Sequence, residues 1–115
     1  MLVVDDTKVN LLVFKGLLRD TEITIDSASS GAEGIELTKK NKYDIIFMDH
    51  LMPEMDGIEA FHRIRDDKDN INRKTPVVAL TANAIAGVRS SYLAEYLSKP
   101  VEQAELLAMT EALLS

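Results

Sequence analysis

The sequence predicts an α/β fold, a doubly wound parallel sheet with helices on both faces. Short apolar segments alternate with segments of helical periodicity five times along the 115 residues. Strands and helices that alternate in this way form a parallel sheet with right-handed crossovers. One segment, 45–48, is apolar without interruption and rich in β-forming residues, which is typical of a strand covered on both faces. The length predicts one domain, 1–115, and a strand that starts at residue 1 predicts that it was cut from a longer protein.

Apolar spacing and capping residues define the elements of the first half. An apolar strand, 1–4, ends at two aspartates. Thr7 is a candidate N-cap for the following helix, which fades by residue 20. Apolar and polar residues alternate over 23–27, which predicts a strand at an edge of the sheet. A short helix with a thin apolar face is predicted over 32–40.

The second half continues the same alternation. Ile58, Phe61 and Ile64 repeat at helical spacing, and the polar, charged stretch 65–74 is predicted to be a solvated loop. The remaining predicted elements are a strand over 77–80 that ends at Thr81, a helix over 84–93, a short strand over 96–98 and a closing helix with Leu106, Met109 and Leu113 on one face.

Composition and charge exclude several classes of function. The net charge of −6 and the isoelectric point near 4.8 argue against a nucleic-acid-binding surface, which would need a basic face. No apolar run reaches the ~18 residues of a membrane span, and no signal-peptide pattern occurs. The absence of cysteine excludes disulfides and thiolate metal sites and fits a cytoplasmic location. His50 and His62 are too few and too badly spaced for a zinc site.

Polar residues collect where the predicted strands end. Asp5 and Asp6 follow the first strand, Asp49 the central one, Thr81 the fourth and Lys99 the fifth. In open parallel sheets, ligands bind in the crevice beyond the carboxyl ends of the strands. A lone aspartate there is more often a helix N-cap or a solvated carboxylate. Four strands that deliver residues of complementary type to one edge indicate a site.

The residue types favour phosphoryl transfer. Three carboxylates in one crevice would repel, and their pKa values would rise unless a cation sat among them. A small set of oxygen ligands suits Mg²⁺, which keeps several waters and shares phosphate oxygens. Asp49 is placed to be a nucleophile that forms an acyl phosphate. Mg²⁺ and the Lys99 ammonium would neutralise the phosphoryl group, and the Thr81 hydroxyl could donate to one of its oxygens.

Four stretches, in this order, share one known pattern: Leu2-Val3-Val4-Asp5-Asp6, Asp49 through Met52-Pro53 to Met55-Asp56-Gly57, Val77 through Thr81-Ala82, and Tyr96-Leu97-Ser98-Lys99-Pro100. With them the chain resembles, over essentially its whole length, the receiver domain of bacterial two-component response regulators. The resemblance implies a flavodoxin-like sheet of five strands in the order 2-1-3-4-5.

The resemblance also implies a reaction. Asp49 would accept a phosphoryl group from a phosphohistidine on a histidine kinase or a histidine phosphotransfer protein. Mg²⁺, or Mn²⁺ in its place, would be held by Asp6, Asp49 and the backbone carbonyl of Leu51, and by Asp5 largely through water. The domain would catalyse its own phosphorylation and dephosphorylation without free-standing turnover, and would contact neither nucleic acid nor membrane. A phosphorylation-dependent homodimer, the input signal and the output stay open.

By the same resemblance, Thr81 and Tyr96 form a switch pair. Phosphate at Asp49 would draw the Thr81 hydroxyl inward, Tyr96 would swing into the vacated space, and the surface of the fourth helix and fifth strand would change. Packing alone is an equally good interpretation of Tyr96. Leu51 has no polar side chain to orient a hydrolytic water, so we expect a persistent acyl phosphate. His50 is a poor candidate for a base, because strand alternation points it away from Asp49.

One segment departs from the family pattern. Thr81 and Lys99 are closer in sequence than in most receivers, by roughly one helical turn. The segment 90–95 also lacks the glycine that usually turns the chain from the fourth helix into the fifth strand. Either that helix is short or a loop is missing from the sequence; we favour the missing loop.

Several alternatives stay open. The motif style around Asp49 favours the receiver of a hybrid sensor histidine kinase, a cytoplasmic portion of a membrane protein, over a stand-alone cytoplasmic regulator. A Mg²⁺-dependent phosphatase with an aspartyl-phosphate intermediate would usually need an acid–base carboxylate where Leu51 stands. A flavin-binding module would place its anionic phosphate against the strand-end carboxylates. A pseudo-receiver that serves only for docking would not need the complete acid cluster and Lys99.

Overall fold

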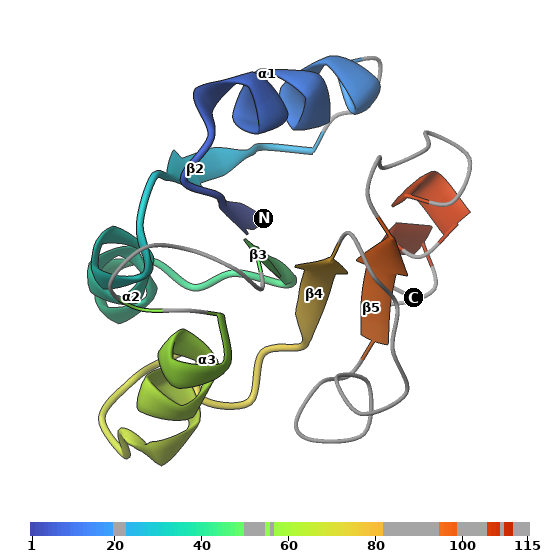
Figure 1. Ribbon diagram of the computed structural model, residues 1–115. Coiled ribbons are helices and arrows are strands. Elements are labelled where there is room, and N and C mark those ends of the chain that lie inside the picture. Colours follow the sequence, from blue (N-terminus) through green and yellow to red (C-terminus); the bar gives the residue numbers. More distant parts are fainter. Residues whose placement is uncertain are drawn as a thin grey trace.

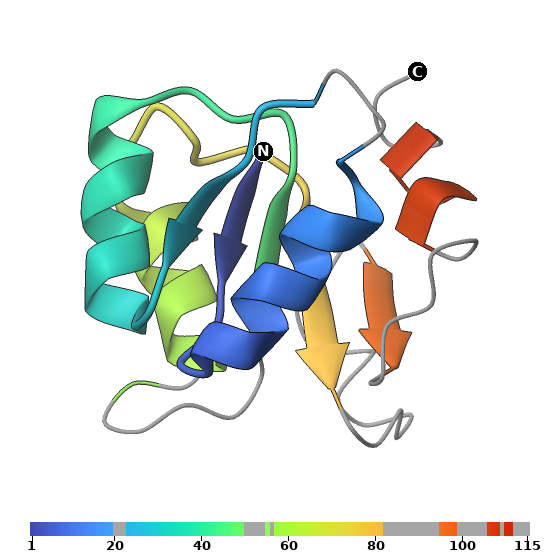
Figure 2. The ribbon, with the colours of Figure 1, turned by 90° about the horizontal axis from the view of Figure 1, so that it is seen from above.

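The structure, a computed structural model, describes residues 1–19, 23–49, 55, 57–81, 95–98, 106–108, 110 and 111. Five parallel strands form one sheet in the order β2-β1-β3-β4-β5 (Figure 1). The strands are β1 (Leu2–Val4), β2 (Asp26–Ala28), β3 (Ile46–Asp49), β4 (Val77–Thr81) and β5 (Glu95–Ser98). Figure 2 shows that all five run in the same direction. The flavodoxin-like order 2-1-3-4-5 is therefore confirmed.

Helices cover both faces of this sheet, as the sequence predicts. The helices are α1 (Lys8–Leu17), α2 (Gly31–Lys40) and α3 (Gly57–Asp66), and residues 106–108, 110 and 111 are helical as well. α2 and α3 lie on one face, whereas α1 and the helical residues near the C-terminus lie on the other (Figure 2). α1, α2 and α3 thus each connect two parallel strands across one face.

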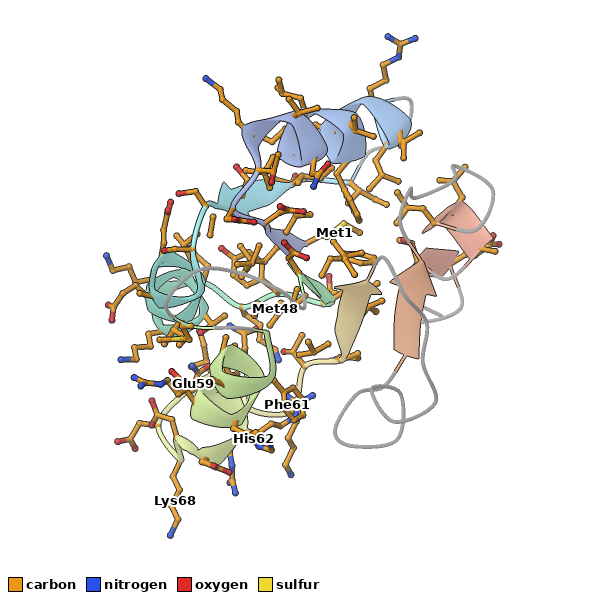
Figure 3. The ribbon with its side chains drawn as sticks, in the orientation of Figure 1. Met1, Met48, Glu59, Phe61, His62 and Lys68 are labelled. Atoms are coloured by element: carbon orange, nitrogen blue, oxygen red, sulfur yellow. The ribbon has the colours of Figure 1, made fainter. Side chains whose placement is uncertain are left out.

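Strand alternation divides the core into two halves. On β3, Met48 points toward α2 and α3, where it packs in one apolar cluster with Phe61 (Figure 3). Its neighbour Phe47 points to the opposite face and meets Phe14 of α1, with the ring centroids 4.8 Å apart. Because both faces are covered, both residues are buried, which explains why this strand is apolar without interruption.

The N-termini of the first two helices are held in different ways. Ser30 caps α2, and its side-chain oxygen accepts the N–H of Glu33 at 3.1 Å. Thr7 occupies the predicted N-cap position of α1, but its side chain makes no cap hydrogen bond. Instead, the Thr7 N–H donates to Oδ1 of Asp5 at 2.9 Å. The position of the cap was therefore predicted correctly, but the Thr7 side chain does not make the capping hydrogen bond.

The edge position predicted for the second strand is confirmed, but its bounds are wrong. The ladder covers Asp26–Ala28 rather than 23–27, and Ile23 lies before it. An edge strand has one neighbour, so its extent depends on pairing with β1, where Leu2 lies opposite Asp26. Local alternation of apolar and polar residues does not report that register.

The prediction of a solvated loop over 65–74 is wrong for two of its residues. Asn70 and Asn72 are buried, and the Asn72 side chain is 0% exposed. Its Nδ2 donates to the carbonyl oxygens of Thr38 at 2.7 Å and Asn41 at 2.6 Å, and its Oδ1 accepts the N–H of Tyr43 at 2.7 Å. A side-chain amide can be buried when its donors and acceptor all find partners, so this polar loop packs as part of the core.

Tyr43 gives the fold a measurable dependence on alkaline pH. The side chain is only 5% exposed, and its hydroxyl donates to Oδ2 of Asp26 at 2.7 Å. Burial, and then this hydrogen bond to a carboxylate, raise the pKa of Tyr43 to about 12. The folded state therefore keeps this proton more tightly than the unfolded state. The contribution of this proton to the free energy of unfolding is fully present below the pKa near 10 that tyrosine has in the unfolded state. It is lost as the pH rises toward 12.

We expect the free energy of unfolding to fall by about 1 kcal/mol more in the wild type than in Tyr43→Phe between about pH 9 and pH 11. Urea unfolding of both proteins at several pH values in this range measures the difference. Lysine titration contributes equally to both curves. Identical pH slopes would show that the tyrosine proton is not held by the fold.

Other expectations lie outside the described residues. These are the helix over 84–93 and the shortened segment before β5. In the parts of the chain that the structure describes, no helix combines the length and the apolar character needed to span a bilayer.

Candidate metal centre

The site begins with the pairing of β1 and β3. These strands are parallel neighbours in which Val4 lies opposite Met48. The next residue on each strand is an aspartate, so Asp5 and Asp49 emerge side by side at the carboxyl edge of the sheet. The Asp5 N–H also donates to the carbonyl oxygen of Ala28 at 3.0 Å, which ties this end of β1 to β2. The pairing of β1 with β3 and the hydrogen bond to β2 thus fix the backbone at Asp5 next to Asp49.

Three carboxylates converge at this edge. Asp5, Asp6 and Asp49 each offer one oxygen atom, and these atoms all lie within 4.8 Å of one another. Asp5 is 1% exposed and Asp49 4%, whereas Asp6 is exposed. Oδ1 of Asp5 accepts the N–H of Thr7, which holds the Asp5 carboxylate in place. The cluster therefore consists of two buried aspartates, Asp5 and Asp49, and one aspartate, Asp6, that is open to solvent.

The donor set fits a hard cation. Carboxylates that leave water and approach one another are unfavourable unless a positive charge compensates them. Two oxygens bound to one Mg²⁺ at about 2.1 Å lie about 3 to 4 Å apart. The 4.8 Å spread of the three oxygens is close to this value, so small side-chain rotations bring them into range. The cluster could hold a metal ion, and its oxygen-only character favours Mg²⁺ or Mn²⁺ over zinc.

The structure describes some of the other predicted site residues and not others. Leu80 lies opposite Asp49, so Thr81, the last residue of β4, lies at the same edge one position further along. Tyr96 lies within β5 opposite Ala79. Lys99, Leu51 and His50 lie outside the described residues, so their predicted places are untested. The structure thus brings the three aspartates together and puts Thr81 at their edge of the sheet.

Sequence reasoning missed the group that orients Asp5. The backbone N–H of Thr7 closes a turn on the Asp5 side chain two residues earlier. Aspartates commonly accept such a hydrogen bond at the start of a helix. The signal was therefore present in the order aspartate, aspartate, threonine, although that order alone does not show which aspartate accepts.

A doubly wound parallel sheet with an acidic cluster at its carboxyl edge defines a class of α/β protein, and comparison with known proteins names the family. Residues 1–111 match the response regulator receiver domain. The chain belongs to this family and is a receiver domain of two-component signalling.

Similar proteins include histidine kinases. The chain is 36% identical to the signal transduction histidine-protein kinase BarA of Escherichia coli K12 over 92% of its own length. It is 38% identical to hybrid signal transduction histidine kinase B of Dictyostelium discoideum over 93% of its length. It spans only 12% and 6% of these two proteins, respectively. The resemblance therefore concerns one module of much longer chains.

Solved structures agree with this family. The receiver domain of sensor histidine kinase PA1611 from Pseudomonas aeruginosa PAO1 is 32% identical, with a TM-score of 0.87 over 99% of this chain and 96% of that one. That receiver was solved with a magnesium ion coordinated in its active site cleft. A two-component response regulator from Clostridium difficile is 30% identical, with a TM-score of 0.87 over 98% of this chain and 93% of that one.

Proposed function

We propose that this receiver domain is a phosphoacceptor in which Asp49 takes a phosphoryl group from a phosphohistidine in a Mg²⁺-dependent reaction. The observation that carries the proposal is the convergence of the Asp5, Asp6 and Asp49 oxygens at the carboxyl edge of the sheet. The magnesium ion in the similar receiver of PA1611 supports the choice of metal. Membership of the receiver family supports the choice of reaction.

The residues divide the chemistry between them. A carboxylate oxygen of Asp49 forms the new bond to phosphorus while the P–N bond of the phosphohistidine breaks, and its electron pair stays on the imidazole nitrogen. Asp5 and Asp6, with Asp49 and the backbone carbonyl of Leu51, are the proposed ligands of Mg²⁺. When bound, the ion supplies positive charge to the phosphoryl oxygens. The Lys99 ammonium and the Thr81 hydroxyl are proposed to contact the remaining oxygens.

The buried position of Asp49 suits this role. A nucleophile at 4% exposure can be reached from the side of the cluster on which Asp6 is exposed. The Asp5 carboxylate accepts the N–H of Thr7, and the Asp5 N–H donates to the carbonyl oxygen of Ala28. Asp5 therefore offers the ion a negatively charged group in a fixed position. Positioning and charge neutralisation account for most of the catalysis of phosphoryl transfer, and this edge of the sheet offers both.

The proposed partner is a histidine kinase or a histidine phosphotransfer protein. The two kinases described above are much longer chains, of which the matching module occupies 6% and 12%. We propose that this receiver likewise belongs to a longer signalling protein of the hybrid kinase type, with phosphorylation read out through Thr81 and Tyr96. Thr81 ends β4 beside Asp49, and Tyr96 lies on the neighbouring strand β5, a placement that suits such a switch.

Acetyl phosphate tests the reaction without a protein partner. In the presence of Mg²⁺ we expect the intact protein to gain the mass of one phosphoryl group, and we expect excess EDTA to abolish the gain because the clustered carboxylates then repel the incoming anion. Mass spectrometry of the intact protein and its fragments measures both the extent and the site of labelling. Equal labelling with and without EDTA would contradict the metal requirement. Repeated release of inorganic phosphate from a phosphate ester would instead favour a phosphatase.

A further inference from the structure

The turn that follows β2 is held by a side chain of α2. Oε2 of Glu33 accepts the N–H of Ser29 at 3.1 Å and the Ser29 hydroxyl at 2.9 Å. In return, the Ser30 side chain accepts the N–H of Glu33 at 3.1 Å, so the turn and the first turn of the helix are bonded to each other. Glu33 therefore fixes the residue that directly follows β2 as well as the start of its own helix.

The end of β2 carries a hydrogen bond that orders Asp5. Ala28 is the last residue of β2, and its carbonyl oxygen accepts the Asp5 N–H at 3.0 Å. β2 is an edge strand of three residues whose neighbour is β1. Hydrogen bonds at the end of a short edge strand open more easily than those in the centre of a sheet. The bond between Ala28 and Asp5 therefore depends on what holds the next residue, Ser29.

The first turn of α2 also packs on β1. A Cβ atom built on Gly34 would lie 2.8 Å from Cγ2 of Val4 and 3.3 Å from its Cγ1. The helix backbone thus lies directly on a fully buried, β-branched side chain that has little rotamer freedom. Val4 precedes Asp5 and lies opposite Ala28 in the sheet. Figure 2 shows the chain passing from the end of β2 directly into α2.

These contacts form a closed ring at the carboxyl edge of the sheet. Its members, joined by peptide bonds, hydrogen bonds and one van der Waals contact, are Val4, Asp5, Ala28, Ser29, Glu33 and Gly34. Glu33 supplies the link from α2 back to the turn after β2. Its side chain is exposed, so this link can be cut without opening the core.

We propose that Glu33 is a positioning residue for the metal centre, because it fixes the backbone at Asp5. Once Ser29 is released, β2 can open at its end, and Asp5 then loses one of the bonds that hold it beside Asp49. In the described part of the chain, the acidic cluster contains Asp5, Asp6 and Asp49 and not Glu33, so we expect the effect of Glu33 on the ion to be indirect. This inference rests on the proposed Mg²⁺-dependent function.

The test uses the whole, unphosphorylated chain and two NMR measurements on Glu33→Ala. The first is amide hydrogen exchange without metal, with the Ile46 amide, which donates to the carbonyl oxygen of Pro76, as the reference. We expect the Asp5 amide to exchange about fivefold faster than in the wild type, the effect of losing roughly one hydrogen bond, while the Ile46 amide is unchanged.

The second measurement is a Mg²⁺ titration at ~0.15 M salt, where distant charges are screened. We expect the Mg²⁺ dissociation constant of Glu33→Ala to rise about threefold. This is less than the ~10-fold or larger loss that follows removal of a group in direct contact with a metal ligand, because Glu33 acts on Asp5 through β2.

Three variants separate positioning from charge and from helix stability. Glu33→Gln keeps an oxygen that can accept the Ser29 groups, so both measurements should stay near the wild type. Glu36→Ala removes the same charge from an exposed position on α2, where Glu36 pairs with Lys39, so neither measurement should change. Ser30→Ala removes the cap that accepts the Glu33 N–H, so it should lower the unfolding midpoint and leave Mg²⁺ affinity unchanged.

The outcomes are distinguishable. Unchanged exchange of the Asp5 amide in Glu33→Ala, or wild-type Mg²⁺ affinity in that variant, would overturn the positioning role and leave the phosphoacceptor function intact. An equal loss of Mg²⁺ affinity in Glu33→Gln or Glu36→Ala would assign the effect to charge, and an equal loss in Ser30→Ala would assign it to helix stability; each result overturns the inference. A wild-type protein that binds no Mg²⁺ would overturn the proposed function and, with it, the role of Glu33 at a metal centre.

Discussion

Asp49→Asn is expected to abolish phosphorylation by acetyl phosphate. The carboxamide oxygen is a poor nucleophile, and loss of the nucleophile in enzymes that form covalent intermediates lowers rates by ~10³-fold or more. The expected result in an intact-mass measurement is no detectable phosphoryl adduct at Mg²⁺ concentrations that label the wild type fully. Because Asp49 lies at 4% exposure beside Asp5, a substitution that keeps its shape should leave the fold in place.

Thermal unfolding provides the control for Asp49→Asn. Removal of one negative charge relieves repulsion within the cluster, so without metal the variant should be at least as stable as the wild type. Added Mg²⁺ should stabilise the variant less than the wild type, because one of the proposed ligands has been weakened. A phosphoryl adduct that survives in Asp49→Asn would show that another residue is the acceptor and would contradict the proposal.

Asn72→Ala is expected to destabilise the protein by ~3 kcal/mol and to lower the unfolding temperature by roughly 10 °C. The substitution removes both donors of the amide from the carbonyl oxygens of Thr38 and Asn41. It also leaves the buried N–H of Tyr43 without its acceptor, and the Thr75 hydroxyl loses an oxygen at 3.0 Å. Urea unfolding followed by circular dichroism measures the loss.

Ile71→Ala is the matched control in the same loop. Ile71 precedes Asn72 directly, yet its side chain is 50% exposed. Its truncation should therefore cost well under ~1 kcal/mol, although isoleucine is the more hydrophobic residue. A larger loss of stability in Ile71→Ala than in Asn72→Ala would mean that the loop is solvated after all and that its buried hydrogen bonds are not maintained in solution.

The polar loop shows why part of the fold could not be predicted. The stretch 65–74 contains charged residues and asparagines, and its apolar residues show no regular spacing. The same pattern fits a loop that is exposed to solvent and one that packs into the core. What places Asn72 in the core is its contact with Thr38, 34 residues earlier, and with Tyr43, 29 residues earlier. A single asparagine carries no local sign of partners so distant in the chain.

The candidate site was predictable to a greater degree. Strands that alternate with helices bring carboxyl ends to one edge, so aspartates at positions 5, 6 and 49 were expected to meet there, and their oxygens do. The prediction needed only the order of strands and the position of each aspartate relative to its strand. The Met55 side chain packs against the core between the sheet and the helices α2 and α3. Its close approach to Gly31 at the start of α2 depends on how these two segments pack, which the spacing of residues does not contain.

The sequence by itself determined the α/β architecture and the edge at which three carboxylates gather, because hydrophobic periodicity and strand ends are local properties of the chain. The strand order was implied by the resemblance to receiver domains, and the sheet confirms it. Only the tertiary structure decided the bounds of the edge strand β2, the burial of Asn72, the hydrogen bond between Tyr43 and Asp26, and the close approach of the Met55 side chain to Gly31. Each of these depends on hydrogen bonds or van der Waals contacts between segments that meet only after the helices have packed on the sheet.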